Sequence, residues 1–414
     1  MKKYLTLLVV LSVIVFCFSP LMRIEVSAVT ESEWYDGLEF ELSEDGTMYK
    51  VIDAKDDLVD IVIPSEYKGL PVTRIESEAF REVGFNRIKS VTMPNTVTSM
   101  GDMVFSGCSK LEEVVLSANL KSIPRSTFHW CNSLKSVKMP NKLESIGDRA
   151  FLDCENLKVL EIPETVTTIG EMAFDGCKSL EKISIPDNIT EIASRTFNCC
   201  ESLATVQIGS GVTEIELYAF NGCKALTSVT LPNVVNISAE AFEGCESLSS
   251  VEFGESLEKI YRAAFKNCIS LENVTIPDSV LHIGEEAFYG CKFTKVTLTC
   301  PGEIEDKAFG YKYDSWEEKE SKITDFTIEG VSGVGGAQAY AERNGFNFVA
   351  LETPVDDGVE NVYTNDIVNE DASYDSYDSE SPELNIFFII IPLVVGLIVV
   401  LAIIMKKKGL LFKK

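Results

Sequence analysis

Phenylalanines recur through the middle of this chain at an almost constant interval. They stand at positions 80, 105, 128, 151, 174, 197, 220, 242, 265, 288 and 309, so that seven of the ten steps are 23 residues long. A fixed period of this size is typical of solenoids, in which each repeat forms one coil and buries its apolar side chains against its neighbours. We therefore expect one elongated stack over this region, although 414 residues would ordinarily suggest two or three globular domains.

The residues around each phenylalanine follow one frame, which is clearest from Ala173 to Pro186. Leu180, Ile183 and Ile185 have the L-x-x-L-x-L spacing of a leucine-rich repeat, and the alternation at its end indicates a short strand with one buried face. Pro186 ends the strand, because proline has no N–H to donate to a sheet. An isoleucine, or a methionine in one repeat, falls five residues before each phenylalanine and is expected to fill the coil from its returning side.

Repetition of this frame predicts the fold class. Twelve strands can be counted, the first over Leu58–Ile63 and the last over Ile323–Ile328. Stacked coils would pair these strands into a parallel sheet. The expected fold over residues 58–329 is an α/β-type repeat solenoid, a leucine-rich-repeat ribbon of about twelve short parallel strands.

Segments on both sides of the solenoid are expected to cap it. Residues 29–57 include a predicted hairpin that turns at Asp45 and Gly46, and residues 330–351 include a helix-like segment over 337–343 followed by an extended one. A charged insertion over residues 311–321 is expected to protrude as a loop.

Two apolar segments near the chain ends predict export and anchoring. Residues 1–28 have the basic start, apolar run and small final residues of a cleavable secretory signal, with an uncleaved anchor helix as the alternative. Residues 385–405 form a predicted transmembrane helix, because the twenty residues from Ile386 to Met405 are uncharged and can cross about 30 Å of hydrocarbon. The lysine-rich tail 406–414 then predicts a cytoplasmic C-terminus and an external solenoid.

Acidic residues dominate the charge of the chain. The net charge is −27, from 37 basic and 64 acidic residues, so nucleic acid and anionic membrane surfaces are not expected as partners. Residues 352–384 contain eleven acidic residues and no basic one, and this composition predicts a disordered stalk between the solenoid and the membrane.

The cysteines also follow the repeat. Disulfides are chemically possible in a secreted protein and between neighbouring coils, but an odd number of positions that recur coil after coil favours small buried residues with free thiols. Cys199, Cys200 and Cys300 are expected to be the most reactive. Nine of the twelve cysteines, which we call the cysteine column, stand three residues after a repeat phenylalanine: Cys108, Cys131, Cys154, Cys177, Cys200, Cys223, Cys245, Cys268 and Cys291.

No motif in the sequence indicates catalysis, a metal or a cofactor. His129 and His282 lie within repeats that suggest no nucleophile–base arrangement, and no C-x-x-C pair indicates a zinc site. We therefore predict no catalytic residue, metal ligand or cofactor, although a count of acidic residues leaves a glycosidase-like carboxylate pair open.

The outer face of the predicted sheet is the candidate binding surface. Side chains that alternate with the buried row point outward, and solenoid sheets form extended binding surfaces. An inert solvated sheet is the alternative for any single residue. The predicted binding residues, which we call the face residues, are Glu113, Ser136, Lys138, Glu161, Lys182, Ser184, Thr205, Gln207, Ser228, Thr230, Glu252, Asn273 and Thr275.

The recurring A-F-x-G-C-x-S-L-x-x-V-x-I-P frame resembles the BspA-like (treponemal-type) leucine-rich repeats. The resemblance covers roughly Val51 to Leu351, although the asparagine ladder of many other leucine-rich repeats is missing. Members of that family are typically bacterial or protist surface proteins implicated in adhesion to host matrix proteins and to other cells. The resemblance implies a surface adhesin but no particular ligand. Together with the predicted signal and transmembrane segments, it leads us to expect a single-pass membrane adhesin whose extracellular partner is a protein or a glycan. A surface polysaccharide- or nutrient-binding module is the alternative, and an enzyme is not expected.

Overall fold

The computed structural model describes residues 32–351, except residues 56, 82–86, 315–318 and 334, and all of these belong to one compact unit. The predicted signal segment 1–28, stalk 352–384, transmembrane helix 385–405 and tail 406–414 lie outside the described residues. Within the described ranges, no helix is long and apolar enough to cross a membrane.

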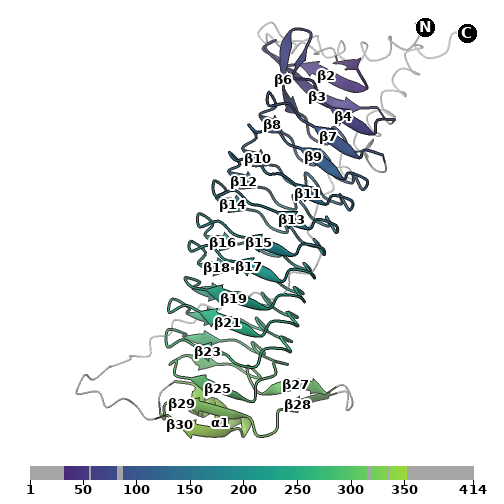
Figure 1. Ribbon diagram of the computed structural model, residues 1–414. Coiled ribbons are helices and arrows are strands. Elements are labelled where there is room, and N and C mark those ends of the chain that lie inside the picture. The colour runs from purple at the N-terminus through teal and green to yellow at the C-terminus, as the bar shows by residue number, and fades with distance from the viewer. Residues whose placement is uncertain (1–31, 56, 82–86, 315–318, 334, 352–414) are drawn as a thin grey trace, which may run out of the picture. The chain divides into compact units, whose positions relative to one another are not determined.

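Two rows of short parallel strands run along the solenoid (Figure 1). The first twelve strands of one row match the number expected from the sequence, and β30 adds one more. This row, the front ribbon, consists of β4 (Asp60–Val62), β7 (Ser90–Thr92), β9 (Glu113–Val115), β11 (Ser136–Val137), β13 (Val159–Leu160), β15 (Lys182–Ser184), β17 (Thr205–Gln207), β19 (Ser228–Leu231), β21 (Ser250–Phe253), β23 (Thr275–Ile276), β25 (Lys295–Leu298), β29 (Thr327–Gly330) and β30 (Asn347–Ala350).

The other row is a departure from the expected fold, because its residues were predicted only to fill the coil interior. Each strand ends on the isoleucine or methionine that precedes a phenylalanine by five residues. That residue is buried, and in most coils it pairs with its equivalent in the next coil, as Ile146 does with Ile169. This second ribbon consists of β6 (Leu70–Ile75), β8 (Ser99–Met100), β10 (Ser122–Ile123), β12 (Ser145–Ile146), β14 (Thr168–Ile169), β16 (Glu191–Ile192), β18 (Glu214–Ile215), β20 (Asn236–Ile237), β22 (Lys259–Ile260), β24 (His282–Ile283) and β26 (Glu303–Ile304).

The solenoid is not of the α/β type, so this part of the prediction was wrong. The described part of the chain has a single helix, α1 (Ala337–Asn344), and strands make up nearly all of its regular structure. The physical reason lies in the turn between the two ribbons. The residue two positions before each repeat phenylalanine has a left-handed backbone, as at Met172 (φ 54°) and Arg195 (φ 56°), and a left-handed residue stops a right-handed helix from forming.

The phenylalanine column forms the centre of the core. From Phe80 to Phe309, neighbouring rings lie 4.9–5.5 Å apart with interplanar angles of 19° or less. Every one of these rings is at most 1% exposed. Strands in a sheet are about 4.8 Å apart, so coils that pair in both ribbons necessarily bring equivalent rings into contact.

Structured segments close the stack at both ends. At the start, β1 (Ser32–Tyr35), β2 (Leu38–Leu42) and β3 (Tyr49–Ala54) pair antiparallel, and β3 continues in parallel into β6, which also pairs with β5 (Glu66–Tyr67). At the other end, the hydroxyl of Tyr340 on α1 donates to the carbonyl oxygen of Phe309 (2.7 Å) and accepts from its N–H (2.9 Å). The helix thereby satisfies the backbone of the last stacked phenylalanine.

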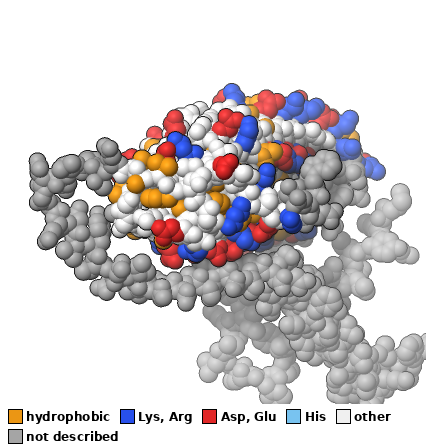
Figure 2. Space-filling model, turned by 90° about the horizontal axis from the view of Figure 1, so that it is seen from below, with side chains coloured by type: hydrophobic (Ala, Val, Ile, Leu, Met, Phe, Trp, Pro, Cys, Tyr) orange, Lys and Arg blue, Asp and Glu red, His pale blue; other side chains and the backbone are white. Residues whose placement is uncertain are grey.

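The strand β30 ends the front ribbon. It pairs in parallel with β29, and among the described strands none pairs with its other edge. Val349 on this strand is 47% exposed. Figure 2 looks at the molecule from this end and shows hydrophobic side chains gathered beside acidic and basic ones.

The insertion after Phe309 is a hairpin, whereas a loop was expected. Its strands β27 (Tyr311–Asp314) and β28 (Lys319–Lys322) pair antiparallel. The ring of Tyr311 meets that of Phe346 edge-on, with centroids 5.7 Å apart. This contact joins the hairpin to the C-terminal cap.

Candidate binding surfaces

All thirteen face residues have exposed side chains. Strand register aligns them in columns: Lys182, Thr205 and Ser228 are successive partners, and Ser184 is the partner of Gln207. The residues between them on each strand are buried and belong to the core. The structure therefore brings the face residues together on one surface, and their role in binding stays a prediction.

The middle of this surface is polar and nearly uncharged. Between β17 and β23, hydroxyl and amide side chains predominate among the face residues. The carboxylate of Glu252 accepts a hydrogen bond from the hydroxyl of Thr230 (3.1 Å). Such a surface offers hydrogen-bond donors and acceptors in a regular array, and it would recognise a partner by shape and hydrogen bonding rather than by charge.

The surface becomes apolar towards its N-terminal end. Val62 and Val115 are 69% and 55% exposed, and they share a column with Thr92, which lies between them in register. None of these three residues is among the thirteen face residues. The same alternation along the strand that identified the others would have found them.

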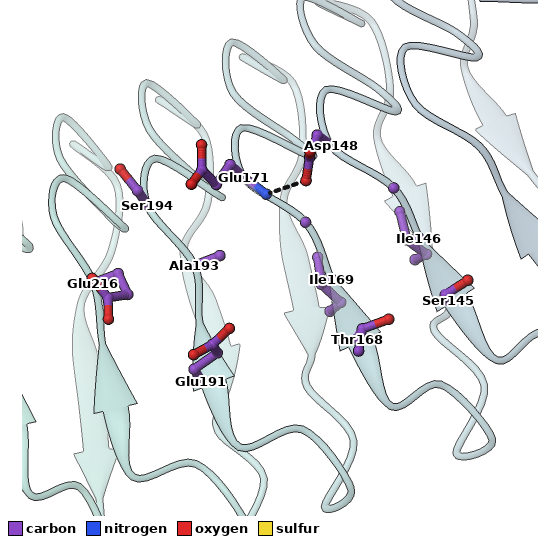
Figure 3. Close-up of a pocket in the computed structure, with 12 residues that line it drawn as sticks. Ser145, Ile146, Asp148, Thr168, Ile169, Glu171, Glu191, Ala193, Ser194 and Glu216 are labelled. Carbon is purple, nitrogen blue, oxygen red and sulfur yellow. Dashed lines mark hydrogen bonds between the residues drawn. The ribbon is translucent and has the colours of Figure 1, made fainter. Parts of the chain in front are cut away.

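A groove of about 590 Å³ lies on the second ribbon (Figure 3). Four carboxylates and no basic side chain line it. Burial raises the pKa of Glu216, and the nearby carboxylates of Glu191 and Glu214 add to this shift. The residues that line it are Ser145, Ile146, Gly147, Asp148, Thr168, Ile169, Gly170, Glu171, Glu191, Ala193, Ser194 and Glu216.

Close packing of the coils shapes the floor of this groove. A Cβ atom at Gly170 would lie 2.2 Å from an oxygen of Asp148, so the floor has no room for a side chain there. That same oxygen accepts a hydrogen bond from the N–H of Glu171 (3.1 Å). Across the part of the chain that the structure describes, no three His, Cys, Asp or Glu side chains are arranged to hold a metal ion. The groove is an acidic surface feature that would favour a cationic group over an anionic one.

The cysteine column consists of buried free thiols. Each sulfur donates to the carbonyl oxygen of the phenylalanine in the preceding coil, for example from Cys154 to Phe128 at 3.0 Å. Burial raises the pKa of the Cys108 thiol to about 12, and it also raises the pKa of the Cys131, Cys154, Cys177, Cys200, Cys223, Cys268 and Cys291 thiols, so these are poor nucleophiles. Of the three cysteines expected to react, Cys200 and Cys300 are also buried, and Cys199 is partly exposed.

Comparisons with known proteins agree with the repeat architecture. A family model described as a BspA type leucine rich repeat region, with six copies, matches residues 54–175, 144–236 and 235–324. No curated protein shows significant similarity to the chain.

Several solved structures are similar to the chain. A leucine-rich repeat protein of T. pallidum shares 26% identity, with 47% of this chain and 91% of that chain covered and a TM-score of 0.44. A leucine rich cell surface protein of Faecalibacterium prausnitzii shares 22% identity, with 78% and 96% covered and a TM-score of 0.42. The pneumococcal vaccine antigen PcpA shares 17% identity, with 78% and 100% covered and a TM-score of 0.44.

Proposed function

Because the chain belongs to the family of BspA-type leucine-rich repeat proteins, we propose that it is a cell-surface binding protein whose front ribbon contacts an extracellular protein. The observation that carries the proposal is the alignment of exposed face residues from strand to strand along the ribbon. Thirteen strands at about 4.8 Å spacing give a surface roughly 60 Å long. A surface of that length can contact a partner over several coils at once.

The chemistry of the front ribbon favours a protein as the partner. Exposed valines at its N-terminal end offer apolar contacts, and the hydroxyl and amide groups further along offer hydrogen bonds. Protein interfaces combine apolar contacts with hydrogen bonds. The partner that we propose is a host matrix protein or a protein on another cell, which would make the chain an adhesin.

Export and anchoring complete the proposal. The segment 1–28 would direct secretion, and the segment 385–405 would hold the chain in the membrane with its C-terminus inside the cell. The acidic segment 352–384 would act as a flexible spacer. We propose a role in binding rather than catalysis, because the front ribbon presents separate polar groups in a regular array.

Binding of the purified full chain to immobilised matrix proteins, measured by surface plasmon resonance, tests the function. Ser228→Arg places a long charged side chain at an exposed position in the middle of the front ribbon, and we expect it to weaken binding by at least about tenfold. Thr190→Arg is the matched control, since Thr190 is exposed and lies next to the second ribbon. The proposal fails if no matrix or cell-surface protein binds, or if both variants bind equally well.

A further inference from the structure

A cleft that is open to solvent lies between the strands β27 and β28 and the coils that precede them. Its volume is about 470 Å³, within the range of roughly 300–1,000 Å³ that is usual for small-molecule sites. The cleft lies outside the front ribbon and the acidic groove. The side chains that line it are Lys266, Asn267, Glu286, Tyr289, Tyr313 and Glu320.

The hairpin positions two of these side chains. Tyr313 and Glu320 are directly opposite each other in the strand register, so they lie on the same face of the hairpin. Tyr311 belongs to the next pair on that face, and its hydroxyl donates to the side-chain oxygen of Asn344 on α1 (2.7 Å). Its carbonyl oxygen also accepts from the N–H of Gly290 (2.8 Å). The base of the hairpin is thus fixed to the solenoid on the side of the cleft.

The charges of the cleft are balanced. The ammonium group of Lys266 lies 2.6 Å from the carboxylate of Glu286, and that of Lys307 lies 2.8 Å from Glu320. The ammonium group of Lys266 also lies 5.3 Å from the centre of the Tyr289 ring. A charged ligand would therefore meet a like charge directly beside each opposite charge. This balance favours an uncharged ligand.

Tyr289 supplies an unpaired polar group inside the cleft. The residue is only 4% exposed, and its hydroxyl, which is not fully buried, has no hydrogen-bond partner among the residues that the structure describes. Burial raises the pKa of this hydroxyl, and the neighbouring carboxylates of Glu320 and Glu286 raise it further. A ligand that covered this hydroxyl would bury it, and buried tyrosine hydroxyls usually find a partner. A ligand in the cleft would provide one.

Tyr313 supplies the complementary feature, an exposed aromatic ring. It is 57% exposed at the wall of the cleft. The exposed side chain of Asn267 adds both a donor and an acceptor. The ring of Tyr313 can thus cover an apolar face of a ligand, and it lies near groups that can form hydrogen bonds to several ligand hydroxyls. Pyranose sugars have this combination of C–H faces and hydroxyl edges.

We propose that this cleft binds an uncharged saccharide, with the ring of Tyr313 against a sugar face and the hydroxyl of Tyr289 bonded to a sugar hydroxyl. Glu286 and Glu320 accept from further sugar hydroxyls without leaving their lysine partners, because each carboxylate has several acceptor positions. The site is separate from the proposed protein-binding ribbon and adds a second kind of ligand. An apolar ligand would fit less well, since it would bury these carboxylates without hydrogen bonds.

A titration of the full chain with neutral sugars tests the proposal. The probes are di- to tetrasaccharides of glucose, galactose, mannose and N-acetylglucosamine, screened on an array and then measured by isothermal titration calorimetry. Tyr313→Ala should weaken binding of the best neutral sugar by about tenfold. Tyr289→Phe keeps the ring and removes the unpaired hydroxyl, so it should weaken binding about three- to tenfold without lowering thermal stability.

Matched controls separate this site from the rest of the surface. Tyr261→Phe removes a hydroxyl from a tyrosine that is 37% exposed and lies outside the cleft, and it should leave saccharide affinity unchanged. Ser228→Arg should also leave it unchanged, so this proposal and the proposed protein binding can fail separately. The saccharide proposal is overturned if no neutral sugar binds, if only acidic sugars bind, or if the Tyr289 and Tyr313 variants bind as tightly as the wild type.

Discussion

Truncation of one ring in the phenylalanine column would measure how strongly neighbouring coils stabilise each other. Phe197 is fully buried, and its ring centre lies 5.4 Å from that of Phe174 and 5.3 Å from that of Phe220. Phe197→Ala removes the buried ring and leaves a cavity between two coils, so we expect the free energy of unfolding to fall by about 3–5 kcal/mol. The two ring–ring contacts account for only about 0.5–1.5 kcal/mol each, so burial and the cavity together are the larger effect.

Urea denaturation followed by circular dichroism gives the size of this loss, and hydrogen exchange read by mass spectrometry gives its location. Because each coil contacts only its neighbours, faster exchange should be confined to the coils around residue 197, and the ends should keep their protection. Leu281→Ala truncates a side chain that is 53% exposed, and this control should change stability by no more than about 0.5 kcal/mol. A loss below about 1 kcal/mol for Phe197→Ala, or an equal rise in exchange along the whole solenoid, would refute the reasoning.

Three further predictions concern the turns and thiols beside the phenylalanine column. Cys199 has a left-handed backbone (φ 55°), and five other coils have a glycine at the equivalent position. Cys199→Gly should therefore raise the free energy of unfolding by about 0.5–1 kcal/mol, and a lower melting temperature would contradict this. Burial, with a smaller contribution from Asp153, raises the pKa of Asp175 to about 6. Because this folded-state pKa lies above the unfolded value, ionisation destabilises the fold as pH rises from about 4 through 6. Asp175→Asn should therefore stabilise the chain at pH 7, by about 1 kcal/mol after solvent screening, but not at pH 4. Thermal unfolding measures this, and an equal gain in stability at both pH values would argue against the raised pKa. Finally, a thiol reagent should label Cys199 quickly in the native chain and the cysteine column only after denaturation. Mass spectrometry of labelled peptides measures this, and rapid labelling of a column thiol in the native chain would contradict the prediction.

The fold could be predicted wherever the same residue type recurs in every coil. Stacking superimposes equivalent positions, so a period of 23 residues is enough to predict the contact of Phe174 with Phe197 and the alignment of Lys182 with Thr205. The second ribbon could not be found in this way. Its strands are mostly two residues long, as at Glu191–Ile192, and two residues contain no alternation that distinguishes a strand from a turn.

The hairpin and its cleft escaped prediction for a different reason. Its strands carry tyrosines and charged residues rather than an apolar face, and its order depends on contacts that are distant in sequence, such as that of Tyr311 with Phe346. The cleft combines residues from positions 266 to 320, and no spacing rule for the repeat brings these together. The face residues were found because their exposure follows from strand alternation alone, which says nothing of what they bind.

Departures from the repeat carry more information about function than the repeat itself. Stacking explains why the interior positions recur, because each buried side chain must fit its equivalent in the next coil. It does not require a hairpin between Phe309 and Ile323, and ordering each residue of that insertion costs about 1–2 kcal/mol of conformational entropy. Nor does stacking require the hydroxyl of Tyr289, because the ring of a phenylalanine would pack in the same place without it. These two departures meet in one cleft, and a ligand that bonds to the Tyr289 hydroxyl and covers the ring of Tyr313 would account for both.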